Sequence, residues 1–159
     1  PARRLIILPA IPASSGGGKN ISIRTEPFMS LAMNLKDYFE NNKGYGVLAT
    51  ADAAGKVNIA VYARPHFLDE HTVVFIMGEK LTQENLQVNP WAAYSFLKAG
   101  DGWMGKRLYL KKLREEQNEE LRKEICRRCD YSRYEVKNRF LVYFKVEKVL
   151  PLIGDGETI

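Results

Sequence analysis

Six short apolar segments constrain the fold of this 159-residue chain more than any other feature does. They cover residues 45–51, 57–63, 73–77, 91–97, 106–113 and 140–150, and most of them are rich in β-branched or aromatic residues. In the segments 57–63, 106–113 and 140–150 the side chains alternate between two faces, as in a strand with one face towards a core. We therefore expect six β-strands, with Val57, Ile59, Val61 and Ala63 on one side of the second.

The connections between these segments favour an antiparallel sheet. Residues 52–55 and 69–72 have the composition of turns, so the first three strands are expected to form a meander joined by two hairpins. Helices are expected as inserts over residues 35–42, 81–88 and 115–128, with Thr82 as the N-cap of the second. The chain has no βαβ alternation. The predicted fold is mainly β, a six-stranded antiparallel barrel with inserted helices.

The chain divides into two parts. Residues 1–28 are predicted to be an N-terminal extension with little order, because a glycine run at 16–18 reads as linker and two prolines interrupt the apolar run 5–13. This run is shorter than the roughly 20 residues of a membrane-spanning helix. Together with the arginines before it, the run also resembles a secretory signal, which is the weaker interpretation. Residues 29–159 are predicted to form a single domain.

Charge and motif content argue against several function classes. Most of the net charge of +5 comes from residues 1–30, so the rest of the chain has too little for a nucleic-acid-binding face. The two histidines, His66 and His71, lack metal-ligand spacing, and a nucleophile elbow is absent. Cys126 and Cys129 form a pair without further ligands, and we expect reduced thiols. The predictions are a cytoplasmic protein, with no metal and with neither membrane nor nucleic acid as partner.

Polar residues at strand ends and at a helix start form the candidate site. After the second strand, Pro65 interrupts the hydrogen-bond ladder, so the flanking arginine and histidine can face a ligand. The start of the helix 81–88 offers free backbone N–H groups and a favourable dipole to an anion, and a guanidinium adds paired hydrogen bonds. We expect these groups to converge on an anion such as phosphate. They are Arg64, His66, Lys80, Thr82 and Arg107.

Four stretches together resemble a known family. They are GVLATA at 46–51, GKVN at 55–58, TVVFIM at 72–77 and NLQVNP at 85–90. In this order and at these intervals, they resemble the FMN-binding split-barrel family of pyridoxamine 5′-phosphate oxidase-like proteins, over about residues 33–153. The resemblance implies a six-stranded split barrel and a homodimer with FMN at the subunit interface.

The resemblance also implies which residues contact the flavin. The segment 62–66 matches one that lines the flavin and its phosphate, but His66 stands where the oxidase has a lysine. A second lysine of the oxidase aligns with Thr82, for which Lys80 can substitute, and Val61 replaces an arginine. These departures argue against pyridoxamine phosphate as the substrate. The implied flavin contacts are Tyr62, Ala63, Arg64, Pro65, His66, Ile76, Met77, Lys80, Thr82 and Arg107.

Three functions stay open at this point. The first is an FMN-dependent oxidoreductase, in which bound flavin moves two electrons to or from a small molecule while the protein supplies orientation and anion contacts. His66, Tyr62 or Tyr109 would then deliver protons or hold substrate, and no catalytic base is assigned. The second is a non-enzymatic FMN-binding or redox-responsive protein. The third is a split barrel that binds haem or a deazaflavin.

Overall fold

The computed structural model describes residues 28–126 and 138–155, with side chains for 35–126 and 138–155. The predicted extension 1–28 lies outside the described residues except for Phe28, where the first helix begins. The elements in chain order are α1 (Phe28–Asn41), β1 (Gly44–Ala51), β2 (Val57–Tyr62), β3 (His66–Phe67), β4 (Thr72–Gly78), α2 (Leu81–Val88), β5 (Trp91–Lys98), β6 (Gly105–Glu116), α3 (Glu119–Ile125) and β7 (Arg139–Pro151).

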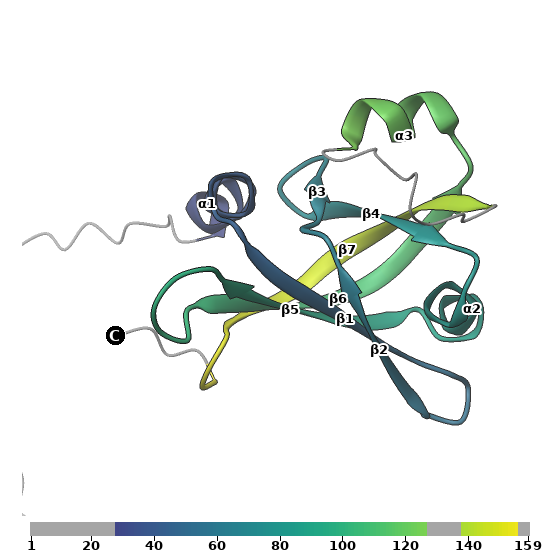
Figure 1. Cartoon of the computed structure of the whole chain (residues 1–159), viewed down its shortest axis with the longest axis horizontal. Helices are drawn as coiled ribbons and strands as arrows, with labels where there is room; N and C mark the ends of the chain where they lie inside the picture. The colour runs from purple at the N-terminus through teal and green to yellow at the C-terminus, as the bar shows by residue number, and fades with distance from the viewer. Residues whose placement is uncertain (1–27, 127–137, 156–159) are drawn as a thin grey trace, which may run out of the picture.

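The strands form one antiparallel sheet in the order β2-β1-β5-β6-β7-β4-β3 (Figure 1). All six predicted strands are present, and the mainly β fold is confirmed. The seventh strand, β3, was not predicted, because its two residues are too few to show the side-chain alternation of a strand. The first predicted hairpin is confirmed, because β1 pairs with β2, but the second is wrong, because β4 pairs with β3 and β7 and not with β2. Pro65, which has no N–H for a ladder, follows β2, and the chain then crosses to the other end of the sheet order.

The start of the third helix also differs from the prediction. Strand β6 continues to Glu116, which pairs with Leu141 of β7, and α3 begins only after Asn118, whose side chain accepts a hydrogen bond from the N–H of Leu121. Long pairing with β7 therefore overrides the helical charge pattern. Cys126 is the C-cap of α3 and forms a disulfide bond, so the expectation of a reduced thiol is wrong for this residue. The predicted helix would have continued through Cys126, but the structure ends α3 at this residue. The remainder of the predicted helix and Cys129 lie outside the described residues.

The main core lies between the sheet and α1. Phe39 of α1 is fully buried, and its ring centroid lies 5.1 Å from that of Phe96 and 5.6 Å from that of Phe67. A smaller apolar cluster lies under α3, where Leu121 and Ile125 pack on β4 and β7. The remaining helix, α2, contacts β1, β2 and β4. Figure 1 shows the three helices at separate places around the sheet.

Gly46 of β1 leaves room for a tyrosine that fixes the segment after β2. Tyr94 is fully buried, and its hydroxyl donates to the carbonyl of Ala63 at 3.2 Å. A Cβ atom at Gly46 would lie 1.9 Å from this hydroxyl. We therefore expect Gly46→Ala to lower the free energy of unfolding by about 1–3 kcal/mol, because a packed core does not absorb an added methyl group. Urea denaturation measures the effect, and a change below about 0.5 kcal/mol would contradict this packing.

Candidate functional site

Side chains of β2 contact the first turn of α2. The side chain of Tyr62, the last residue of β2, lies near the hydroxyl of Thr82 in α2. Asn58, from the same face of β2, donates from Nδ2 to Thr82 Oγ1 at 3.2 Å. Burial raises the pKa of Tyr62, and the nearby Thr82 hydroxyl opposes part of that rise. These three side chains, Asn58, Tyr62 and Thr82, form what we call the β2–α2 polar cluster.

Thr82 has a different local role from the predicted one. The N-cap of α2 is Lys80, which has an extended backbone and makes no side-chain cap hydrogen bond, so the N-cap prediction for Thr82 is wrong. The Thr82 side chain is buried and bonds to β2, a tertiary contact that local capping rules do not include. Lys80 itself is exposed at the start of the helix. Both predicted residues therefore lie at the helix N-terminus, but only Thr82 belongs to the cluster.

Arg64 is directed towards the C-terminal end of α1. Its Nη1 donates to the carbonyls of Phe39 at 2.6 Å, Glu40 at 3.1 Å and Asn42 at 2.6 Å. The last carbonyls of a helix carry partial negative charge, so a guanidinium is favourable there. Arg64 thus connects α1 to the segment after β2. Its contact with a flavin phosphate stays a prediction.

Three further residues of the resemblance, His66, Ile76 and Met77, lie on β3 and β4. His66 is half-buried and pairs with Val74. Met77 is fully buried in the main core, whereas Ile76 packs in the smaller cluster under α3, so the two side chains point to opposite faces of β4.

Among residues 28–126 and 138–155, no three His, Cys, Asp or Glu side chains are placed to hold a metal ion.

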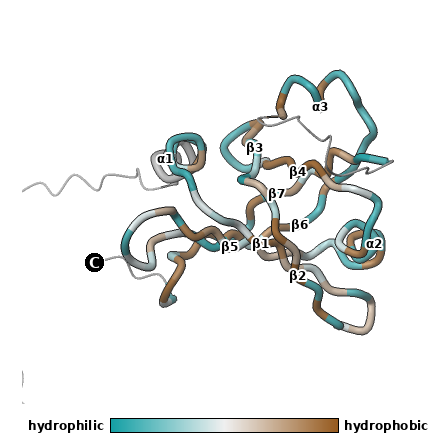
Figure 2. The backbone as a smooth tube through the Cα atoms, in the orientation of Figure 1, coloured by the Kyte–Doolittle hydropathy of each residue, from teal (hydrophilic) through white to brown (hydrophobic). Residues whose placement is uncertain are grey.

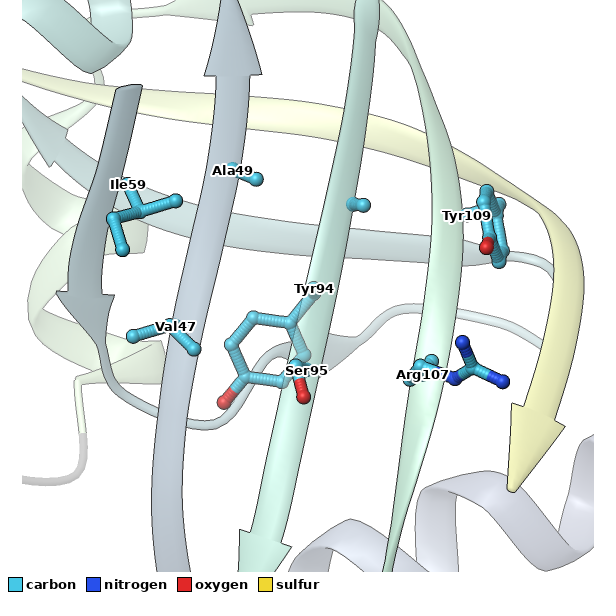
Figure 3. Close-up of a pocket in the computed structure, with 8 residues that line it drawn as sticks. Val47, Ala49, Ile59, Tyr94, Ser95, Arg107 and Tyr109 are labelled. Atoms are coloured by element: carbon cyan, nitrogen blue, oxygen red, sulfur yellow. The ribbon is translucent and has the colours of Figure 1, made fainter. Parts of the chain in front are cut away.

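Arg107 lies on the opposite face of the sheet from the β2–α2 polar cluster. Its Nε donates to the carbonyl of Pro151 at 3.0 Å and its Nη2 donates to the carbonyl of Gly154. It borders an apolar groove of about 200 Å³ across β2, β1, β5 and β6, which Figure 3 shows side by side, with the guanidinium extending towards β7. The structure therefore does not bring Arg107 to Tyr62. The groove is lined by Val47, Ala49, Ile59, Ala93, Tyr94, Ser95, Arg107 and Tyr109.

The outer face of β2 is apolar and exposed. Val57, Ile59 and Val61 expose 67%, 69% and 81% of their surface, and Figure 2 shows hydrophobic residues along β2. The predicted alternation is present, but the expectation that its apolar side faces a core is wrong, because the face carrying Asn58 and Tyr62 is the one that meets α2. We call the exposed side, together with Val47 of the paired strand β1, the outer apolar face.

Sequence reasoning missed Asn58 as a member of the site. The available signal was a single asparagine in an otherwise apolar strand, at even spacing from Tyr62. Polar side chains on the helix-facing side of a strand need partners, and Thr82 supplies one. The sequence does not reveal that partner, because the pairing depends on where α2 lies.

Comparisons with known proteins identify the fold. No family model matches the chain, and no curated protein matches its sequence. Among solved structures, an FMN-binding protein from Syntrophomonas wolfei subsp. wolfei has 22% identity and a TM-score of 0.66, covering 80% of this chain and 90% of that one. A putative pyridoxamine 5′-phosphate oxidase from Lactobacillus delbrueckii has 21% identity and a TM-score of 0.52, covering 80% and 97%.

The same fold occurs in HutZ, the haem storage protein from Vibrio cholerae, with 15% identity, a TM-score of 0.54 and coverage of 74% of this chain and 92% of that one. At these identities the likeness shows the fold alone. It is the fold of FMN-binding and pyridoxamine 5′-phosphate oxidase-like proteins, as the resemblance implies. In the part of the chain that the structure describes, no helix is long and apolar enough to cross a membrane.

Proposed function

We propose that this chain is an FMN-binding oxidoreductase of the pyridoxamine 5′-phosphate oxidase-like type. The observation that carries the proposal is the β2–α2 polar cluster, in which Asn58 bonds to Thr82 beside Tyr62 and so brings together the two segments for which the resemblance implies contacts with the flavin and its phosphate. The fold shared with an FMN-binding protein supports it. Bound FMN would supply two-electron transfer to or from a small molecule.

The start of α2 fits a phosphate. The first N–H groups of a helix have no partner within the helix, and the N-cap residue Lys80 provides no side-chain hydrogen bond to them. The helix dipole and the exposed lysine both favour an anion at this end. Lys80, Thr82 and the segment 62–66 would hold the phosphate, with Arg64 and His66 as its cationic or donor groups. Tyr62 would orient the cofactor through the hydroxyl network with Thr82.

The proposed assembly is a homodimer formed through the outer apolar face. Exposed apolar patches of this kind mark interaction sites, and a twofold axis lets the same patch cover itself. Val61 and Ile59 are its most exposed members, and Ile59 also lines the groove that Arg107 borders. Since Arg107 lies on this face, it would reach a flavin only at the subunit interface. The proposed location of the dimer is the cytoplasm, with a small molecule as substrate or electron donor.

Substitution of the cluster threonine tests the assignment. Thr82→Val keeps the shape of the side chain but removes the hydroxyl, so we expect the Kd for FMN to rise about 5- to 20-fold, the equivalent of one to two hydrogen bonds. Titration followed by quenching of flavin fluorescence measures it. The control is Thr72→Val at the start of β4, for which FMN affinity is expected to stay within about twofold. Equal affinity of Thr82→Val and the unsubstituted protein would refute the role of the cluster.

Haem or deazaflavin binding is the second candidate. The observation favouring haem is the fold shared with a haem storage protein, together with a half-buried histidine, His66, in the predicted site. An absorption spectrum separates these cofactors. If FMN binds, anaerobic reduction by a nicotinamide cofactor followed by reoxidation separates an enzyme from a protein that only binds flavin, since only the enzyme turns over repeatedly.

A further inference from the structure

We propose that Lys112 and Glu115 of β6 are positioning residues for the phosphate end of the flavin site, because they fix α2 on the sheet. This inference rests on the proposed FMN function. It concerns residues for which the resemblance implies no role, and the sequence pattern assigned Glu115 to a helix. In the structure both belong to the extended part of β6 and face α2.

The two residues form a clamp on α2. Lys112 Nζ lies 2.7 Å from Glu115 Oε2 and also donates to the carbonyl of Leu86 at 3.1 Å. Glu115 Oε1 accepts from Gln83 Nε2 at 3.1 Å, and Gln87 Nε2 donates to both carboxylate oxygens, at 3.1 and 3.0 Å. One ion pair thus contacts the helix at three positions, spread over more than one turn. We call it the β6 clamp.

The clamp is largely shielded from water. The side chains of Lys112 and Glu115 are 12% and 21% exposed. Burial favours the neutral acid, but hydrogen bonds from Lys112, Gln87 and Gln83 outweigh it and hold the pKa of Glu115 below its usual value. The carboxylate is therefore ionised at neutral pH, and its contacts with the helix are charge-assisted hydrogen bonds, which are stronger than neutral ones.

The opposite side of α2 is held by β1 and β2. Asn58 Nδ2 donates to Thr82 Oγ1, and Asn85 Nδ2 donates to Thr50 Oγ1 at 3.2 Å in a fully buried contact. A helix of eight residues is not stable alone, so tertiary contacts decide where it lies. The clamp and these two hydrogen bonds therefore determine together where the N-terminus of α2 stands relative to Tyr62.

Positioning of this kind predicts a selective effect on ligand binding. Because the start of α2 would contact the phosphate and not the ring system, release of the clamp should weaken FMN more than riboflavin, which has the same ring system but no phosphate. A purely structural role would weaken both ligands equally or neither. The ratio of the riboflavin Kd to the FMN Kd is therefore the informative quantity.

The experiment compares Glu115→Gln and Lys112→Met with the unsubstituted protein. Glu115→Gln removes one carboxylate oxygen and the charge, and Lys112→Met keeps the apolar stem but loses Nζ, so the second variant serves if the first fails to fold. The matched control is Glu147→Gln, which breaks a lysine–glutamate pair on β7 (Lys145 Nζ to Glu147 Oε1, 3.1 Å). Isothermal titration of each folded protein with FMN and with riboflavin gives the ratio, and thermal melting checks folding.

The expected result is a fall of the ratio by about 5- to 10-fold in both clamp variants, from loss of charged hydrogen bonds, and a change within about twofold in the control. An unchanged ratio in folded variants, or an equal loss of affinity for both ligands, would overturn the positioning role while the FMN proposal stands. Failure of the unsubstituted protein to bind FMN would overturn the proposed function and this inference with it.

Discussion

Ile59→Lys is expected to convert the proposed dimer into a monomer and to weaken FMN binding at least about 10-fold, because the proposed flavin site lies at the subunit interface and would be lost with it. Ile59 lies within the outer apolar face and is 69% exposed in one protomer. In a twofold dimer the substitution places two lysines in the interface, and a buried unpaired charge costs about 3–5 kcal/mol. Converted to a dissociation constant, this free-energy cost means that the dissociation constant of the dimer should rise by a factor of about 100 or more.

Sedimentation equilibrium over a range of concentrations measures this constant. The control is Leu68→Lys, which places the same charge at an exposed leucine in the turn after β3, outside the outer apolar face. We expect it to remain a dimer. A monomeric unsubstituted protein, or an Ile59→Lys variant that dimerises normally, would show that this face is not the interface.

Arg64→Ala is expected to lower the free energy of unfolding by roughly 2–3 kcal/mol, because hydrogen bonds made by a charged group are removed and the carbonyls at the end of α1 lose their partner. The three acceptors are the carbonyls of Phe39, Glu40 and Asn42. If the guanidinium also pairs with phosphate, FMN affinity should fall by ~1.5–3 kcal/mol. Denaturant titration measures the first effect, and FMN titration of the folded variant measures the second.

Arg114→Ala serves as the comparison for Arg64→Ala. Arg114 is a largely exposed arginine that lies over the ring of Tyr143 at 3.6 Å and pairs with Glu116, so its loss should cost less than about 1 kcal/mol. A stability loss at Arg64 with unchanged FMN affinity would leave it as an anchor of α1 and reject its phosphate contact. Unchanged stability would contradict the role seen at the end of α1.

The strands and the first hairpin were predictable from local pattern, whereas the rest of the strand pairing was not. Alternation and β-branched composition identify six strands because both depend on neighbouring residues only. The crossing after Pro65 puts β2 and β4 far apart in the sheet order, and no local signal encodes that choice. The extension of β6 to Glu116 was also not predictable, because a charged segment favours a helix when it is considered alone. In the structure this segment pairs with the long strand β7.

The candidate site was predictable in part. Tyr62 and Thr82 were both predicted as site residues, and the structure brings them close together. The outer apolar face was misassigned to a core because alternation does not tell which side of a strand is covered by the same protomer. Arg64 was predicted to face a ligand, and its bonds to α1 follow from where the helix ends, which strand periodicity does not report.

The visible absorption spectrum of the full chain, purified without added cofactor, tests the FMN assignment most directly. The expected result is a pair of flavin bands from a chromophore that is released on denaturation and co-migrates with FMN in chromatography, since the cofactor would be held without a covalent bond. A colourless protein that also fails to bind added FMN would contradict flavin binding. A Soret band would show that the cofactor is haem and not FMN.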